Sequence, residues 1–437
     1  MTGYFAAQAW LPDGVQPEVR IAVQDGRFTQ VTPHSQRSSA DEWLPGLVLP
    51  GFANTHSHAF HRALRGRTHD AHGTFWTWRE AMYRVANRLD PEAYFALARA
   101  TYAEMALAGI CSVGEFHYLH HQRNGRQYRD PNEMSHAVRH AAREAGVRLT
   151  LLDCAYLAGG IGRVVAEPQR RFSDGSVAGW AKRHAALYDD DSTRVGVAIH
   201  SVRAVPRDAL PTLVTAAQGC PLHFHLSEQP AENQSSLAAY GRTPTAVFLE
   251  SGALGRDSTA VHATHVSADD IAILGRSATS ISLCPTTERD LADGIGPARR
   301  LSDAGASITV GTDQHAVIDP FEEARALEID ERLAAGRRGH FRPSELLQTL
   351  TTAGQRSLGW PDAGRIEAGA RADLVEIRLD TVRTAGCLVD QVIMAATAAD
   401  VRTVVVDGRP MVRNGQHMLG DIGALLNAAI EPIWHAA

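Results

Sequence analysis

The chain has 437 residues, enough for one large domain and a smaller one, and its hydrophobic content of 44% can fill a sizeable core. Its 43 Lys and Arg against 49 Asp and Glu leave a net charge of −6 with histidine neutral, which argues against a nucleic-acid partner or an anionic-membrane surface. It shows neither a secretory leader pattern nor an apolar run long enough to span a bilayer, so we expect a soluble, cytoplasmic protein.

Short strands are expected at both ends of the chain. Near the N-terminus, the segments 19–23 and 27–31 flank an Asp-Gly pair, which is typical of a hairpin turn. Near the C-terminus, the apolar segment 401–406 is followed by a second Asp-Gly turn. A chain that begins and ends in strands predicts one small β-sandwich domain, formed by residues 1–46 and 365–437 together.

Residues 47–364 show a different rhythm of apolar runs separated by amphipathic segments. Apolar residues recur at helical spacing in three clear examples, which are 91–108, 133–145 and 177–188. Eight runs have the length of strands: 47–52, 109–116, 148–157, 195–200, 221–226, 259–265, 280–284 and 307–311. Eight strand–helix units predict an α/β fold of the (β/α)8 TIM-barrel type. The competing α/β arrangement is a doubly wound open sheet.

A pair of histidines, His56 and His58, follows the first of these runs. Alternate side chains of a strand point to one face, so two histidines separated by one residue can share a metal ion. Zinc and related ions readily take neutral imidazole as a ligand. The alternative is a chance pair of surface histidines, because the chain has 21 of them.

Further polar residues end the fifth, sixth and eighth runs. His225 and Glu228 close the fifth, His262 lies in the sixth, and Asp313 follows the eighth. The C-terminal ends of barrel strands meet at one rim, so His225 and Asp313 would complete a metal site with an open position for water. Singly, each residue has a structural alternative. One of His223 and His225 can merely pack, His262 can be a core histidine bonded to a carbonyl, and Asp313 can cap a helix that starts near Pro320.

This arrangement resembles the amidohydrolase superfamily along essentially the whole chain. The resemblance implies the barrel with its flanking β domain and a divalent ion, most simply zinc, held by His56, His58, His225 and Asp313. In members with two metals, a carboxylated lysine follows strand four. Here the fourth run ends in His200 and the only lysine, Lys182, lies upstream, so one ion is expected. The H-x-x-E pattern that ends in Glu228 is typical of the deaminases, in which the glutamate moves protons.

A narrower resemblance is to the formimidoylglutamate deiminases of histidine degradation. It rests on FWTWRE at 75–80, EFHYLHH at 115–121, HSVRAV at 200–205 and VHATH at 261–265. By this resemblance, the substrate carboxylates are held by Arg79, Tyr118, His200 and Arg203. Guanidinium forks and a phenol suit a dianionic substrate. The alternatives are surface ion pairs for the two arginines and a core position for Tyr118.

The sequence departs from that pattern at three places. His61 stands where these enzymes usually have a substrate-contacting glutamine, Gln314-His315 replaces a serine-histidine pair, and 284–288 is less apolar than expected. We expect His61 to tune substrate binding and not to bind the metal, with an exposed histidine as the alternative.

The expected function is therefore a metal-dependent C–N hydrolase that converts N-formimidoyl-L-glutamate and water to N-formyl-L-glutamate and ammonia. The resemblance gives Glu228, His262 and Asp313 the catalytic roles. The expected partners are a small dianionic substrate and a second copy in a homodimer. The alternatives are a deaminase of a heterocyclic base such as a purine or pterin, and an inactive barrel that serves as an interaction protein. An inactive relative would usually have lost metal ligands.

Overall fold

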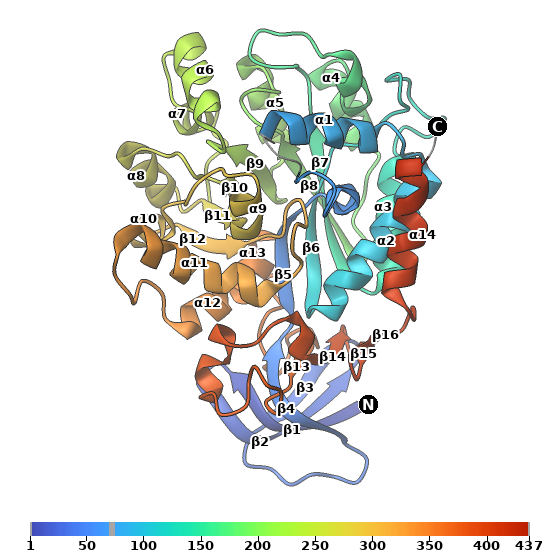
Figure 1. The fold of residues 1–437 in the computed structure, drawn as a ribbon, viewed down its shortest axis with the longest axis vertical. Coiled ribbons are helices and arrows are strands. Elements are labelled where there is room, and N and C mark those ends of the chain that lie inside the picture. The colour runs from blue at the N-terminus through green and yellow to red at the C-terminus, as the bar shows by residue number, and fades with distance from the viewer. Residues whose placement is uncertain (1, 70–74, 436–437) are drawn as a thin grey trace.

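The computed structural model describes residues 2–69 and 75–435, and it contains two eight-stranded sheets (Figure 1). In the larger sheet every neighbouring pair of strands is parallel, and the strands follow one another in chain order. Its strands are β5 (Phe52–Ser57), β6 (Ile110–His117), β7 (Arg148–Ala155), β8 (Thr193–Ile199), β9 (Leu222–Leu226), β10 (Ser258–His262), β11 (Ser280–Leu283) and β12 (Ser307–Val310). A doubly wound sheet would reverse its strand order, so the predicted barrel is confirmed.

The barrel closes between its first and last strands. Beyond β12, the Asp313 amide donates to the His56 carbonyl at 3.0 Å, and the His58 amide donates to the Asp313 carbonyl at 3.1 Å. Gly311 makes this approach possible, because a Cβ there would lie 2.7 Å from the His56 Cβ and 2.8 Å from its backbone nitrogen. The seam of the barrel therefore runs through the residues predicted to bind metal.

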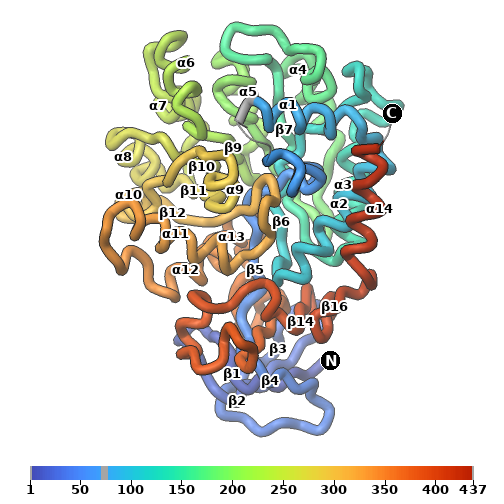
Figure 2. The backbone as a smooth tube through the Cα atoms, in the orientation of Figure 1, coloured from blue at the N-terminus to red at the C-terminus, as the bar shows by residue number. Residues whose placement is uncertain are grey.

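Helices surround this sheet, as the tube in Figure 2 shows. They are α1 (Phe75–Ala86), α2 (Pro91–Leu107), α3 (Glu133–Ala145), α4 (Val177–His184), α5 (Leu210–Ala216), α6 (Pro230–Tyr240), α7 (Pro244–Glu250), α8 (Ala268–Arg276), α9 (Pro285–Asp290), α10 (Ala298–Asp303), α11 (Pro320–Ala335), α12 (Pro343–Leu350) and α13 (Thr352–Ser357). Short 3-10 helices lie at η1 (Ala59–Leu64), η2 (Glu167–Phe172), η3 (Arg207–Ala209), η4 (Val389–Met394) and η5 (Ala398–Asp400). Two of the three predicted helices keep their expected extent, and the third ends early, at His184. Among the described residues, no helix combines the length and apolar character needed to cross a membrane.

The second sheet confirms the β domain built from both termini. Its strand order is β16-β15-β14-β13-β4-β1-β2-β3, and it is mixed because β1 and β4 pair in parallel. Its strands are β1 (Thr2–Leu11), β2 (Gly14–Gln24), β3 (Arg27–Thr32), β4 (Glu42–Pro50), β13 (Leu374–Ile377), β14 (Val401–Val406), β15 (Arg409–Arg413) and β16 (Gln416–His417). The N-terminal and C-terminal strands join where β4 pairs with β13. A separate apolar core, which includes Tyr4, Ile21 and Phe28, stabilises this domain.

The structure differs from the predicted domains at two places. Residues 47–50, expected to begin the first barrel strand, belong to β4 and pair with β13, and the barrel begins at Phe52. At the other end, residues predicted within the β domain form α14 (Ile422–His435), which packs against α2 (Figure 1). The Trp434 indole also donates to the Ala63 carbonyl at 2.9 Å. Residues 1 and 436–437 of the predicted domain lie outside the described residues.

Candidate metal centre and active site

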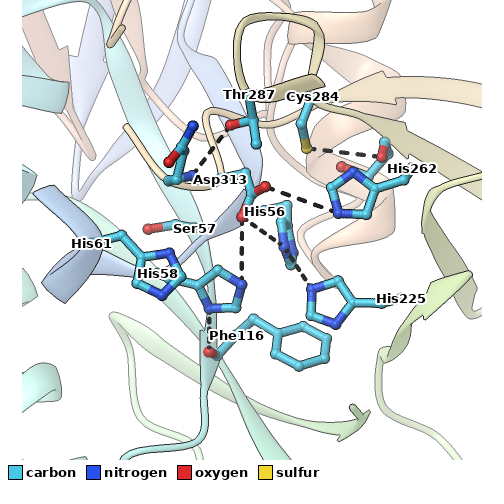
Figure 3. Close-up of polar contacts among 12 residues, drawn as sticks. His56, Ser57, His58, His61, Phe116, His225, His262, Cys284, Thr287 and Asp313 are labelled. Atoms are coloured by element: carbon cyan, nitrogen blue, oxygen red, sulfur yellow. Dashed lines mark hydrogen bonds and ion pairs between the residues drawn. The ribbon is translucent and has the colours of Figure 1, made fainter. Parts of the chain in front are cut away.

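The four predicted metal ligands lie together at the C-terminal ends of β5, β9 and β12 (Figure 3). The Nε2 atoms of His56 and His225 are 3.1 Å apart. The Asp313 Oδ1 lies 3.4 Å from His56 Nε2 and 3.5 Å from His58 Nε2. All four side chains are buried. His223, the alternative to His225, instead approaches the Ser357 carbonyl with its Nε2 at 3.0 Å.

Backbone carbonyls fix the orientation of two of these rings. His58 Nδ1 donates to the Phe116 carbonyl at 2.9 Å, and His225 Nδ1 donates to the His200 carbonyl at 2.8 Å. With Nδ1 protonated, the Nε2 of each neutral ring carries a lone pair that is directed toward the cluster. Burial lowers the pKa of His58 to about 3 and lowers the pKa of His225 well below its usual range. Neutral imidazole is the form that binds metals.

The chemistry of this donor set fits a divalent ion. Ligand atoms of His56, His58 and Asp313 all lie within 4.8 Å of one another, and so do those of His56, His225 and His262. Three neutral imidazoles and one carboxylate match the ligands that zinc prefers. Asp313 is not a helix cap, because Asp319 caps α11 by accepting from the Phe321 amide at 3.0 Å.

The chain turns sharply at these strand ends. Ser227, His262 and Asp313 have positive φ angles of 49°, 69° and 42°. Side chains other than glycine rarely adopt this left-handed region, and such conformations concentrate at functional sites. Each of these three residues lies where the chain leaves a barrel strand, beside the histidine–aspartate cluster.

His262 faces carboxylates and not a carbonyl, so its predicted core alternative is wrong. Its Nε2 lies 3.8 Å from Glu228 Oε1 and 3.9 Å from Asp313 Oδ2. On the other side of the ring, its Nδ1 lies 3.4 Å from Glu288 Oε1. Burial opposes protonation, but Glu228, Glu288 and Asp313 together raise the pKa of His262 to about 10.

A cavity of about 550 Å³ adjoins this cluster, and all five residues predicted to bind substrate line it. They are His61, Arg79, Tyr118, His200 and Arg203. His61 is only 2% exposed and its Nε2 lies 2.8 Å from the Tyr118 hydroxyl, so the exposed alternative for His61 is wrong. Arg79 lies with its guanidinium carbon 5.7 Å from the Tyr83 ring centroid. The structure thus brings the predicted cationic and donor groups to one cavity.

The prediction missed three residues of the site, which are Glu232, Glu288 and Arg163. Arg203 contacts two carboxylates, with Nη2 3.1 Å from Glu228 Oε2 and Nε 3.0 Å from Glu232 Oε2. Glu232 lies in the first turn of α6, and no pattern in the sequence marked it. Glu288 lies in a segment noted only as a departure from the family pattern. Arg163, which also lines the cavity, has no comparable signal in the sequence.

Residues 47–411 match a family model described as "Amidohydrolase family". The chain belongs to the amidohydrolase family. Among its relatives, this amidohydrolase is 36% identical to the formimidoylglutamate deiminase of Pseudomonas aeruginosa over 436 residues, which cover 95% of this chain and 96% of that enzyme. It is 28% identical to the 8-oxoguanine deaminase of the same organism, over 95% of this chain and 94% of that enzyme.

A solved structure gives the same assignment. The crystal structure of an amidohydrolase from Brucella melitensis superimposes with a TM-score of 0.91 at 31% identity, covering 99% of this chain and 100% of that one. This amidohydrolase is accordingly a hydrolase of the deaminase type that acts on C–N bonds. Its family generally binds a divalent metal, in keeping with the histidine–aspartate cluster at the rim.

Proposed function

We propose that this amidohydrolase is a formimidoylglutamate deiminase, which converts N-formimidoyl-L-glutamate and water to N-formyl-L-glutamate and ammonia. One observation carries the proposal: Arg79, Arg203 and Tyr118 line the same cavity as three of the four candidate metal ligands. A substrate with two carboxylates needs paired cations and donors of this kind. The similarity to the Pseudomonas aeruginosa enzyme supports the same substrate.

The proposed cofactor is a single zinc ion held by His56, His58, His225 and Asp313. Bound there, it would supply Lewis-acid activation of a water molecule. A single ion is proposed because Lys182, the only lysine, is exposed on α4 and does not line the cavity.

The proposed chemistry assigns proton transfer to Glu228. Its carboxylate accepts a proton from the attacking water and delivers it to the terminal amidine nitrogen. The hydroxyl of the resulting tetrahedral intermediate then passes its proton through Glu228 to the same nitrogen, the carbon–nitrogen bond breaks, ammonia leaves, and the oxygen of the water becomes the formyl oxygen. His262, whose Nε2 lies beside Glu228 and Asp313, donates a hydrogen bond that stabilises the tetrahedral intermediate. Asp313, whose Oδ2 lies 3.9 Å from His262 Nε2, assists the first deprotonation.

Substrate binding is proposed to use Arg79, Tyr118, His200 and Arg203 for the two carboxylates. Bidentate guanidinium–carboxylate pairs fix direction as well as distance, so the formimidoyl carbon is aimed at the rim cluster. His61 contacts the Tyr118 hydroxyl and orients it. In this way the histidine supports substrate binding at a position where related enzymes have glutamine.

A second candidate function has one observation in its favour. Aromatic side chains, including Trp78, Tyr156 and Phe172, also line the cavity and could stack on a heterocyclic base. The 8-oxoguanine deaminase among the relatives acts on such a base, as its name states.

Ammonia release from a panel of substrates tests the two functions against each other. The panel is N-formimidoyl-L-glutamate, N-formimidoyl-L-aspartate, guanine, 8-oxoguanine and cytosine. We expect the highest kcat/KM for N-formimidoyl-L-glutamate. Faster release from any of the bases would establish the second function and overturn the first.

A further inference from the structure

Arg203 lies between two carboxylates that differ in their surroundings. Its Nη2 contacts Glu228, the proposed proton carrier, at 3.1 Å, and its Nε contacts Glu232 at 3.0 Å. The Arg203 side chain is 18% exposed, while that of Glu228 is 9% and that of Glu232 is 0% exposed. Shielded charges interact far more strongly than exposed ones, so this is not a surface ion pair of small effect.

Glu232 is anchored at both ends of its carboxylate. One oxygen accepts from the Ser227 amide at 3.2 Å, and the other faces Arg203. Glu232 also belongs to the first turn of α6, where acidic side chains interact favourably with the helix dipole. It therefore fixes the position of the Arg203 guanidinium relative to the strand ends.

Glu228 has a different arrangement. Its Oε2 contacts Arg203, while its Oε1 lies 3.8 Å from His262 Nε2. A carboxylate paired with arginine on one side is restrained from turning toward an attacking water. Arg203 and Glu228 both line the cavity assigned to the substrate.

We propose that Arg203 couples substrate binding to the release of Glu228, a proposal that rests on the function proposed above. A substrate carboxylate that reaches Arg203 takes the place of Glu228 at Nη2, and repulsion between the two anions turns Glu228 toward the water. Glu232 holds the guanidinium in place during this exchange. It is a positioning residue, because it acts through Arg203 and touches no reacting atom.

This exchange makes the substrate's charge part of the catalytic step. A substrate that lacks the carboxylate leaves Glu228 paired with Arg203. Binding energy from a remote group then raises kcat and does not merely lower KM. The ratio of kcat/KM between dianionic and uncharged substrates is therefore larger than the binding contacts alone provide.

The first test divides the substrate into pieces. N-propylformamidine has the reacting group and the carbon chain of N-formimidoyl-L-glutamate but neither carboxylate, and acetate supplies a carboxylate separately. We expect acetate to raise kcat for N-propylformamidine about tenfold in a saturable manner. Sodium chloride at the same ionic strength should produce no such rise. Absence of stimulation by acetate would overturn the coupling.

The second test removes the anchor. In Glu232→Gln, Arg203 has lost one of its two anions and restrains Glu228 more tightly. We expect kcat for N-formimidoyl-L-glutamate to fall about tenfold while KM stays the same or decreases, and Glu232→Asp should recover part of the loss. Metal content and melting temperature are measured on the same samples. Glu250→Gln is the matched control, because Glu250 pairs with Arg207 and Arg242 at the surface.

The outcomes separate the two proposals. If the wild type does not hydrolyse N-formimidoyl-L-glutamate, the proposed function fails and the coupling fails with it. If the wild type does so but acetate has no effect, only the coupling is wrong. A Glu232→Gln variant with raised KM and unchanged kcat would likewise overturn the coupling, since Glu232 would then only shape the cavity.

Discussion

Two buried, histidine-rich clusters lie on this barrel, and only one of them is arranged for a metal. The rim cluster consists of His56, His58, His225, His262 and Asp313. The outer cluster lies between strands β6 and β7 and helix α4, and it consists of His117, His120, His121, Asp153, Asp174, Arg183 and His184. The number of histidines does not distinguish the two clusters.

The clusters differ in how their charges are neutralised. In the outer cluster, Arg183 contacts Asp153 at 2.6 Å and Asp174 at 3.0 Å, so arginine neutralises both carboxylates. At the rim, ring nitrogens of neutral histidines face Asp313 beside an open cavity. Among the described residues, every group whose ligand atoms converge closely enough for a metal ion includes His56 or His262 at the rim. Convergence of lone pairs and access to a cavity therefore identify a metal site better than histidine density does.

Metal removal should have the largest effect and tests this comparison directly. We expect dialysis against a chelator to abolish ammonia release, and one equivalent of zinc per chain to restore it. Elemental analysis of the purified protein should show about one ion per chain, because only the rim cluster offers convergent ligands. Two equivalents, both needed for activity, would contradict the single-ion assignment.

The next largest effect is expected from Glu228→Gln. The amide keeps the size of the side chain but cannot carry the proton, and a positioned proton-transfer group contributes about 10²–10⁴-fold in rate. We expect kcat to fall by that amount with metal content unchanged. His262→Asn should behave in the same way. A Glu228→Gln variant with near-normal kcat would show that another group moves the proton.

Arg79→Met sharpens the comparison by testing the cavity beside the rim cluster. Loss of one partner of a shielded charge pair costs about 2–5 kcal/mol, so kcat/KM for N-formimidoyl-L-glutamate should fall about 100-fold. Arg84→Met is the matched control, since Arg84 is exposed on the same helix. Steady-state kinetics of both variants decide the matter. Equal loss in the two would assign the effect to the helix and not to substrate binding.

Asp153→Asn should have the smallest effect on catalysis and the clearest effect on stability. Burial alone would favour the neutral acid, but Arg183 and His184 hold the pKa of Asp153 well below its usual range. Removing one partner of a buried pair costs about 3–5 kcal/mol in the free energy of unfolding. Because the folded-state pKa is lowered, this contribution is present above about pH 4 and is lost as the pH falls further.

Urea unfolding at several pH values checks this expectation. The difference between wild type and Asp153→Asn should shrink as the pH falls below about 4. Metal content and kcat/KM at neutral pH should stay at wild-type values. Loss of the metal in this variant would show that the outer cluster supports the rim cluster after all.

The barrel and the rim cluster could be predicted because strand order is enough to place them. In a (β/α)8 barrel, the C-terminal ends of all strands converge. His56, His225 and Asp313 needed only to follow the first, fifth and eighth strands to be expected together. All eight apolar runs overlap the observed barrel strands, but the first does so only at Phe52 and otherwise lies mainly in β4. There, one continuous apolar segment contributes residues to both sheets. Only the pairing of β4 with β13 shows that this segment is divided at Gly51.

Interactions between side chains on different elements could not be predicted. The pair formed by Arg203 and Glu232 depends on how α6 begins relative to the end of β8. Helix α14 was missed although Ile422, Leu426 and Ile433 have helical spacing, because the preceding strands suggested a continuing sheet. The orienting contact of Glu288 with His262 likewise joins helix α9 to the end of β10.

The seam between β5 and β12, where Gly311 allows the close approach, determines the order of barrel closure and metal uptake in each new chain. Asn54 and Thr312, which are 258 residues apart, form a side-chain hydrogen bond across it at 2.7 Å. A nascent chain that has not yet produced β12 has the first histidines of the proposed ligand set but not the closing carboxylate. Tight uptake of the ion then follows closure of the barrel, since metal affinity depends on a folded site. Ion content would therefore separate finished molecules from chains stalled during synthesis.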